Sequence, residues 1–278
     1  MVGVAMIGQF LIVFREALEA ALIIGIVVAY LERVERRDLF RYLYLGTAGA
    51  VISSLVLAWS VQWLFGELTG TSRSLFEGVS SLTAAAVLTY MIFWMSRQAQ
   101  RIRGDLQKKV DLIITSGQTL GIALLAFTAV FREGVETILF LTTLFTQDPS
   151  GTIVGAAVGL AVVMTLAFLL IKRMYRLDIR RFFRITSVLL IVFAAGLTGY
   201  GVHELIEADM LPAIIEQVWD INPPLNPDGS YPLLHEKGVV GSILKTLIGY
   251  DGDPELLRVI AYIGYWIVIG VVMRRLPS

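Results

Sequence analysis

Seven apolar stretches, each long enough to cross a lipid bilayer, constrain how this chain folds. A transmembrane α-helix needs about 20 predominantly apolar residues. The stretches cover residues 8–31, 42–65, 75–95, 112–145, 152–171, 182–207 and 256–273. Hydrophobic residues make up 56% of the 278 residues, which exceeds the share in a typical soluble domain. We therefore expect an all-α membrane protein in which residues 1–278 form one domain of seven transmembrane helices.

Positively charged residues gather in alternate connections between the predicted spans. Lys and Arg follow the first, third, fifth and seventh spans, but none precedes the first span or separates the fourth from the fifth. Because positively charged loops stay on the cytoplasmic side, we expect the N-terminus outside and the C-terminus in the cytoplasm of a cell-membrane protein. The first stretch has no basic region before it and contains charged residues, so we expect it to remain in the mature protein.

The longest predicted connection, residues 208–255, lies on the outer side and carries eight acidic and two basic residues. Its segment 222–229 holds three prolines and a glycine, which predicts a turn. The apolar pieces at 214–219 and 239–248 are too short to span and are expected to lie on the membrane surface. The acidic residues fit either a solvated loop or a surface that concentrates cations.

A short motif occurs twice and predicts an internal repeat. Phe-Arg-Glu, two variable residues and Glu stand at 14–19 in the first span and at 131–136 in the fourth. Since three spans separate the copies, they run in opposite directions through the membrane. This predicts two inverted three-helix repeats, about 8–96 and 112–207, followed by the outer loop 208–255 and a seventh helix at 256–273. Transporters built from inverted repeats bind substrate near the membrane midplane.

The charged residues of both copies lie near the middle of their spans, where an ionised side chain costs about 2.5–3.5 kcal/mol to insert. Residues three or four apart share a helix face, so the two glutamates of each copy lie side by side. Two arginines can neutralise only two of four glutamates. We therefore predict a multivalent-cation site formed by Glu16, Glu19, Glu133 and Glu136, with Arg15 and Arg132 as charge-balancing residues. The alternative, two ion pairs that join helices, does not explain the extra glutamate in each copy.

The chemistry of the available side chains limits which metal such a site holds. The chain contains no cysteine and two histidines, so thiolate sites and iron–sulfur clusters are excluded. Carboxylates suit hard cations such as ferric iron, and also ferrous iron, manganese and magnesium. A di-iron oxidoreductase in the membrane is a lesser alternative, because such enzymes use Glu-x-x-His motifs on two helices. A transporter of another divalent cation, such as lead or manganese, is the main alternative.

The sequence resembles the high-affinity iron permeases, which include the fungal ferric permease and its bacterial EfeU-type counterparts. The resemblance rests on Arg-Glu-x-x-Glu in the first and fourth spans, Phe76-Glu77-Gly78, Trp94-Met95 and His203-Glu204-Leu205. It implies import of iron, expected to be ferric, into the cytoplasm. Iron is then a transported substrate and not a cofactor, and the chain is not an enzyme. The resemblance also implies a separate ferroxidase or periplasmic iron-handling protein as partner. We expect no nucleic-acid partner.

Four further residues near the predicted outer ends of spans form a candidate outer site, Glu77, His203, Glu204 and Glu207. A glutamate at a helix N-terminus also complements the helix dipole, which accounts for Glu77 without a metal. Glu204 and Glu207 lie at a helix C-terminus, where that explanation fails. Separately, Gly151, Gly155 and Gly159 form a face that allows close helix contact, either within the chain or in a homo-oligomer.

Overall fold

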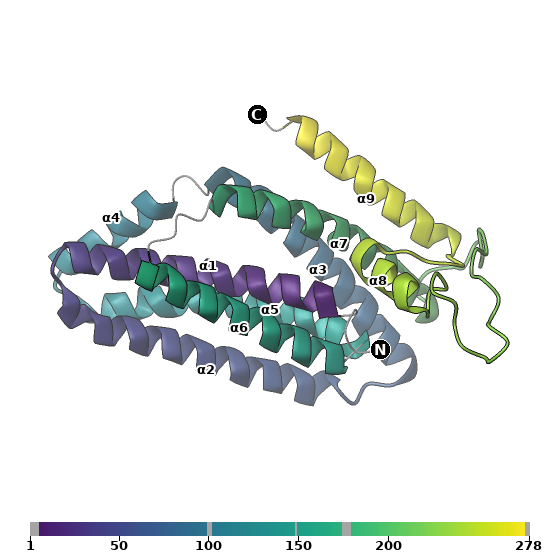
Figure 1. The fold of residues 1–278 in the computed structure, drawn as a ribbon, viewed down its shortest axis with the longest axis horizontal. Coiled ribbons are helices and arrows are strands. Elements are labelled where there is room, and N and C mark those ends of the chain that lie inside the picture. Colours follow the sequence, from purple (N-terminus) through teal and green to yellow (C-terminus); the bar gives the residue numbers. More distant parts are fainter. Residues whose placement is uncertain (1–5, 99–101, 148, 174–178, 276–278) are drawn as a thin grey trace.

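The computed structural model describes residues 6–98, 102–147, 149–173 and 179–275, and this part of the chain contains helices and no β-strand (Figure 1). The predicted all-α class is therefore confirmed. The helices are α1 (Met6–Arg33), the 3-10 helix η1 (Arg37–Leu39), α2 (Phe40–Phe65), α3 (Gly70–Gln98), α4 (Ile102–Thr115), α5 (Thr119–Gln147), α6 (Pro149–Arg173), α7 (Ile179–Glu207), α8 (Val239–Ile248) and α9 (Leu256–Arg275).

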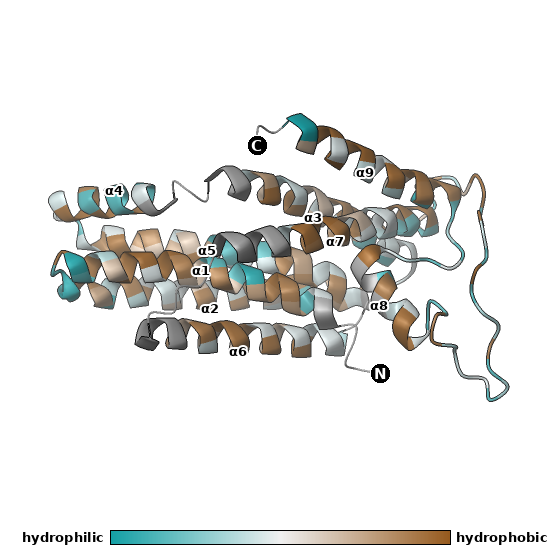
Figure 2. Cartoon of the chain, turned by 45° about the horizontal axis from the view of Figure 1, so that its top comes forward, coloured by the Kyte–Doolittle hydropathy of each residue, from teal (hydrophilic) through white to brown (hydrophobic). Residues whose placement is uncertain are grey.

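Five helical segments of the described residues are long and apolar enough to cross a membrane. They are Arg37–Phe65, Gly70–Trp94, Pro149–Phe168, Thr186–Glu207 and Leu256–Arg275. Helices α1 and α5 are equally long, but each carries three charged residues of the motif within its apolar sequence. Crossing by these two helices, and so the count of seven spans, stays a prediction. Most of the coloured helical ribbon in Figure 2 is hydrophobic.

Three pairs of helices pack along each other, α1 with α6, α2 with α5, and α3 with α7. Helix α1 also contacts α5, and α9 packs against α7. Gly159 of α6 faces the backbone of Phe10 and Phe14 in α1, so the predicted glycine face serves a contact within the chain. A core of buried apolar side chains joins α1, α3, α5, α7 and α9. This packing brings the two motif-bearing helices side by side in the centre of the bundle.

The start predicted for the fourth span, 112–145, is wrong. Helix α4 ends at Thr115, the chain turns at Gly117 with a φ of +69°, and α5 begins at Thr119. Sequence analysis missed α4 because its charged residues leave no continuous apolar run. Its buried Val110 packs with Leu31 and Leu43 beside the connection between α1 and α2.

The outer connection is folded back on itself. Its piece at 239–248 is helical, as α8, and the predicted turn is present, with the Gly229 N–H donating to the Asn226 carbonyl at 2.9 Å. The piece at 214–219 is not helical. Instead, the Val218 N–H donates to the Pro254 carbonyl at 2.9 Å and tethers this segment to the chain before α9.

The two ends of the bundle differ in the segments that they carry. Figure 1 places the connection between α1 and α2, together with α4, at one end, and the start of α1 with α8 at the other. The first end holds the basic residues after α1 and the second holds the acidic connection. Arg101 and Arg176, which contributed to the predicted orientation, lie outside the described residues.

Candidate metal site

The motif in α1 forms a buried cluster around one guanidinium group. Arg15 is 1% exposed, and its Nη1 donates to Glu16 Oε1 at 2.6 Å. Its Nη2 lies 2.8 Å from Glu19 Oε1, one helical turn away. The Nη1 group also lies 3.5 Å from the Met91 sulfur of α3. The Arg15 guanidinium is therefore shared between both carboxylates of this copy.

The motif in α5 has a different arrangement. Arg132 Nε donates to Glu136 Oε1 at 2.8 Å, while the guanidinium carbon stands 4.7 Å from the centre of the Trp94 ring. The Arg132 side chain is 46% exposed. Glu133 is buried, and no ion pair with Arg132 is found for it among the described residues. This copy therefore has one paired and one unpaired carboxylate.

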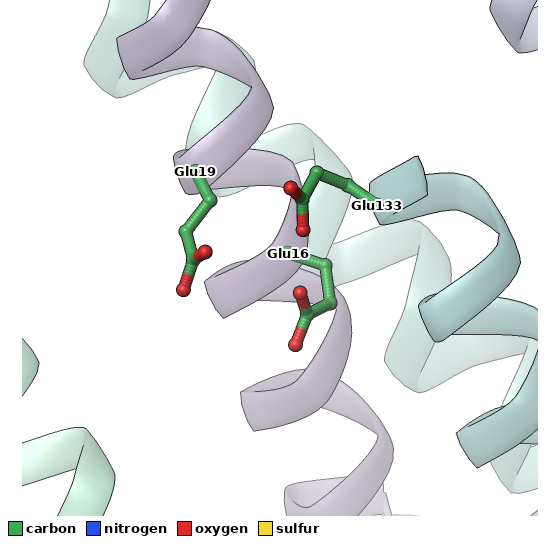
Figure 3. Close-up of side chains that lie close together, drawn as sticks. All are labelled: Glu16, Glu19 and Glu133. Atoms are coloured by element: carbon green, nitrogen blue, oxygen red, sulfur yellow. The ribbon is translucent and has the colours of Figure 1, made fainter. Parts of the chain in front are cut away.

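Carboxylates of both copies meet at the contact between α1 and α5. Glu16, Glu19 and Glu133 each offer an oxygen atom, and these atoms all lie within 4.8 Å of one another. Figure 3 shows the Glu133 carboxylate directed from α5 toward Glu16. Within the described residues, Glu16 Oε2 and Glu133 Oε2 are buried without a hydrogen-bond partner. Arg15 is the one buried arginine among the described residues that contacts this group, so the excess negative charge of the group favours a multivalent cation.

Glu136, the fourth predicted ligand, lies outside this group of three. Its Oε1 is held by Arg132, but its Oε2 is buried and has no hydrogen-bond partner in the described part of the chain. Oxygen atoms on opposite sides of a small divalent ion, with bonds of about 2.1 Å, stand about 4.2 Å apart. Three oxygens within 4.8 Å are thus close to a coordinating arrangement.

The four residues of the predicted outer site line one pocket of about 370 Å³. The pocket lies where the N-terminal end of α3 meets the C-terminal ends of α5 and α7, and its walls are Arg73, Ser74, Glu77, Thr146, Tyr200, His203, Glu204 and Glu207. Arg73 Nε donates to Glu77 Oε1 at 2.7 Å, and the Tyr200 hydroxyl donates to Glu77 Oε2 at 2.5 Å. Helix packing thus unites residues more than a hundred positions apart.

Sequence reasoning missed four residues that line this pocket, Arg73, Ser74, Thr146 and Tyr200. It also missed Glu255, which contacts the lining residue His203. Arg73 stands four residues before Glu77, a spacing that indicates an ion pair on a helix. Glu255 lies 2.6 Å from His203 Nδ1, across the whole outer connection, and no local spacing indicates that contact. Partial burial by itself raises the pKa of the Glu255 carboxyl. The hydrogen bond with His203 and the other contacts outweigh this effect, so the pKa of Glu255 lies below its usual range.

A third acidic group, Glu236, Asp251 and Asp253, lies in the outer connection. Its charges are largely balanced within the described residues. Lys245 Nζ lies 3.1 Å from Glu236 Oε2, and Arg258 pairs with Asp251. This group therefore serves to hold the connection onto α8 and α9.

Comparison with known proteins gives one consistent result. Residues 6–276 match the model of the Iron permease FTR1 family. The ferrous iron permease EfeU of Yersinia pestis is 31% identical over 94% of this chain and 91% of its own length. EfeU of Escherichia coli is 31% identical over 94% of this chain and 93% of its own length. An uncharacterized protein of Archaeoglobus fulgidus is 41% identical over 94% and 91% of the two chains.

No solved structure matches this chain. The resemblance seen in the sequence is confirmed across nearly the full length, and it includes both helices that carry the carboxylates. The chain is a multi-pass membrane protein that transports iron, and it belongs to the Iron permease FTR1 family.

Proposed function

We propose that iron crosses the membrane through a central site made by Glu16, Glu19, Glu133 and Glu136. The observation that carries this proposal is the meeting of three buried carboxylates from two helices within 4.8 Å. Burial without enough counter-charge is costly in a membrane, and a multivalent cation removes that cost. Iron is the cargo in this account, and the chain performs no catalysis.

Glu136 completes the site when Arg132 moves away. Arg132 is half exposed and bonds one carboxylate oxygen, so its release breaks few contacts. Glu136 Oε2, which has no hydrogen-bond partner among the described residues, is already directed to buried space. Arg15 is enclosed by Glu16, Glu19 and Met91, so it stays in place as a fixed positive charge.

The two triplets α1–α3 and α5–α7 are proposed as inverted repeats. The packing of α1 on α6 has its counterpart in the packing of α5 on α2, while α3 with α7 and α1 with α5 join the halves. Such a symmetric pattern supports alternating access, in which one half rocks against the other around a central site. In this proposal the N-terminus lies outside, and α9 is an addition to the repeats.

The outer pocket is proposed as the place where iron first binds. Glu77, Glu204 and Glu207 give it negative charge, and His203 adds a nitrogen ligand. From there, an inside-negative potential drives a cation inward by about 2.3 kcal/mol per charge per 100 mV. Uptake needs no nucleotide in this scheme.

The oxidation state has two candidates. The sequence favours ferric iron, because carboxylates suit hard cations. The name of two relatives, ferrous iron permease, favours the ferrous ion. A separate ferroxidase or periplasmic iron-handling protein and a homo-oligomer remain predictions. Manganese and lead are the competing cargoes, because oxygen ligands discriminate weakly among these cations.

Uptake of labelled iron by proteoliposomes, supplied in each oxidation state, tests the proposal. Glu16→Gln and Glu133→Gln should each lower uptake about tenfold or more, because each removes a charged ligand. Glu67→Gln, at an exposed glutamate between α2 and α3, is the matched control and should transport as the wild type does. Normal uptake by both central variants, at normal amounts of folded protein, rules out the central site.

A further inference from the structure

One face of α3 runs from the outer pocket to the central carboxylates. Glu77, Ser81, Ala84, Leu88 and Met91 follow one another at spacings of three or four residues, and all are buried. Glu77 lines the outer pocket, and the Met91 sulfur contacts Arg15. This face therefore borders any route between the two sites.

Helix α5 supplies the opposite side of that route. Glu136, Phe140, Thr143 and Thr146 share a face, and Thr146 lines the outer pocket. Thr143 is fully buried, and its hydroxyl lies 3.5 Å from Ser80 Oγ of α3. At a rise of 1.5 Å per residue, Thr143 stands about 10 Å outward of Glu136.

The hydroxyl groups of Ser81 and Thr143 differ from others in these helices. Thr83 and Thr89 in α3, and Thr142 in α5, donate to their own helix carbonyls four residues earlier. Ser81 Oγ is buried and has no hydrogen-bond partner within the described residues. The Thr143 hydroxyl points to α3 instead of its own backbone. An unpaired buried hydroxyl costs about 1–3 kcal/mol, so its retention calls for a polar partner.

An apolar layer separates these hydroxyls from the carboxylates. Ile12 lies one helical turn outward of Glu16, and Phe140 lies one turn outward of Glu136. Both are buried and belong to one core cluster with Ala84 and Leu88. A hydrated ion cannot pass such a layer without movement of these side chains.

We propose that Ser81 and Thr143 line the inner end of the path by which iron leaves the outer pocket, and that Ile12 and Phe140 form the outer gate. This inference rests on the proposed function, including its orientation and central site. The hydroxyls hold the hydrated cation one layer above the carboxylates. Separation of α1 and α5 at the gate then admits the ion to Glu16 and Glu136.

The absence of cysteine from the sequence gives a direct test, because each introduced thiol is the only one. Ser81→Cys, Thr143→Cys, Ser74→Cys and Thr83→Cys are made singly and reconstituted in sealed liposomes. A charged, membrane-impermeant thiosulfonate is added from the outer side. Ser74 lines the outer pocket and is the positive control. Thr83 is exposed on the opposite face of α3, only two residues from Ser81, and is the matched lipid-facing control.

Ser81→Cys and Thr143→Cys should react at least about tenfold faster than Thr83→Cys, since thiols in lipid meet no charged reagent. Saturating iron should slow both reactions. Rates equal to that of Thr83→Cys, with Ser74→Cys modified, overturn the path. The reaction rates do not depend on the central ligands, so failure of the central site appears separately, as normal uptake by Glu16→Gln and Glu133→Gln.

A second variant tests the proposal independently, in case the cysteine variants do not fold. Ser81→Ala with Thr143→Val removes both hydroxyls and keeps side-chain volume. Maximal iron uptake should fall at least about fivefold, as loss of one hydrogen-bonding group predicts, while iron bound per protein in detergent stays the same. Thr83→Val is the control. Unchanged maximal uptake in the double variant contradicts the proposal.

Discussion

The two copies of the Arg-Glu-x-x-Glu motif have the same spacing but different surroundings. In α1, Arg15 is buried and contacts both glutamates of its own copy. In α5, Arg132 is half exposed, bonds only Glu136 and stacks on Trp94. In the α1 copy both glutamates thus share one buried arginine, whereas in the α5 copy one glutamate is unpaired among the described residues. In the proposed mechanism, Arg15 stays in place and Arg132 moves. An internal repeat can therefore divide support and motion between its copies.

The largest expected difference concerns the two arginines. Arg15→Gln leaves two buried carboxylates without their cation and should destabilise the protein by about 3–5 kcal/mol. Arg132→Gln removes a pair in which the arginine is half exposed and bonds one carboxylate oxygen, and should cost less, about 1 kcal/mol. Thermal unfolding of the purified variants in detergent measures both. Equal losses of stability in the two variants would show that the two arginines contribute equally to folding.

Substitutions of Glu16 and Glu133 should both lower transport but should differ in their effect on stability. Glu16→Gln weakens a buried hydrogen bond to Arg15 and should lower the free energy of unfolding by about 1.5–3 kcal/mol. It should also lower iron uptake. Glu133→Gln breaks no ion pair among the described residues and removes a buried charge, so uptake should fall while the unfolding temperature stays equal or rises. Parallel unfolding and uptake assays check this. A large loss of stability in Glu133→Gln contradicts the claim that this carboxylate has no stabilising partner before iron binds.

One of the two variable positions of the motif shows how the copies differ in packing. Ala17 in α1 corresponds to Gly134 in α5, and a Cβ at Gly134 would collide with Ser54 of α2. Gly134→Ala makes the copies more alike and should destabilise the protein by about 1–3 kcal/mol through overpacking. Ala17→Gly should cost about 1 kcal/mol through helix propensity alone. Gly134→Ala combined with Ser54→Gly is the rescue control in the unfolding assay, and a failure to recover stability argues against this contact.

The smallest effect is expected at Trp94. Its contact with the Arg132 guanidinium contributes about 0.5–1 kcal/mol and should break when iron draws Glu136 into the site. Addition of iron should change the tryptophan fluorescence of the wild type more than that of Trp94→Phe. Glu133→Gln, which binds iron poorly in this account, should show little change. An identical response of the wild type and Trp94→Phe excludes the movement of Arg132 from the mechanism.

Sequence periodicity predicted much of this arrangement. The length of the apolar stretches predicted the long helices, and the spacing of the motif predicted that Glu16 and Glu19 share a face. The break at Gly117 and the presence of α4 were missed, because apolar runs carry little information about short amphipathic helices. Residue spacing alone does not detect a helix that is held by packing against α1 and α5.

The difference between Arg15 and Arg132 was beyond sequence reasoning. It depends on which residues of α3 stand nearby, Met91 for one arginine and Trp94 for the other. These contacts come from the tertiary packing of α3 and not from the repeated motif. The same holds for His203 and Glu255, which are joined only because the outer connection folds back. Local spacing predicted which carboxylates share a helix face, while long-range packing determines which of them are unpaired among the described residues.

The central claim is that iron binds between Glu16, Glu19 and Glu133. An anomalous-difference map at the iron absorption edge, from crystals of the wild-type protein given less than one equivalent of iron, tests it most directly. The account predicts one dominant peak among these three carboxylates, with oxygen ligands only and Arg15 still paired. A dominant peak beside His203 in the outer pocket, with none between α1 and α5, would contradict it.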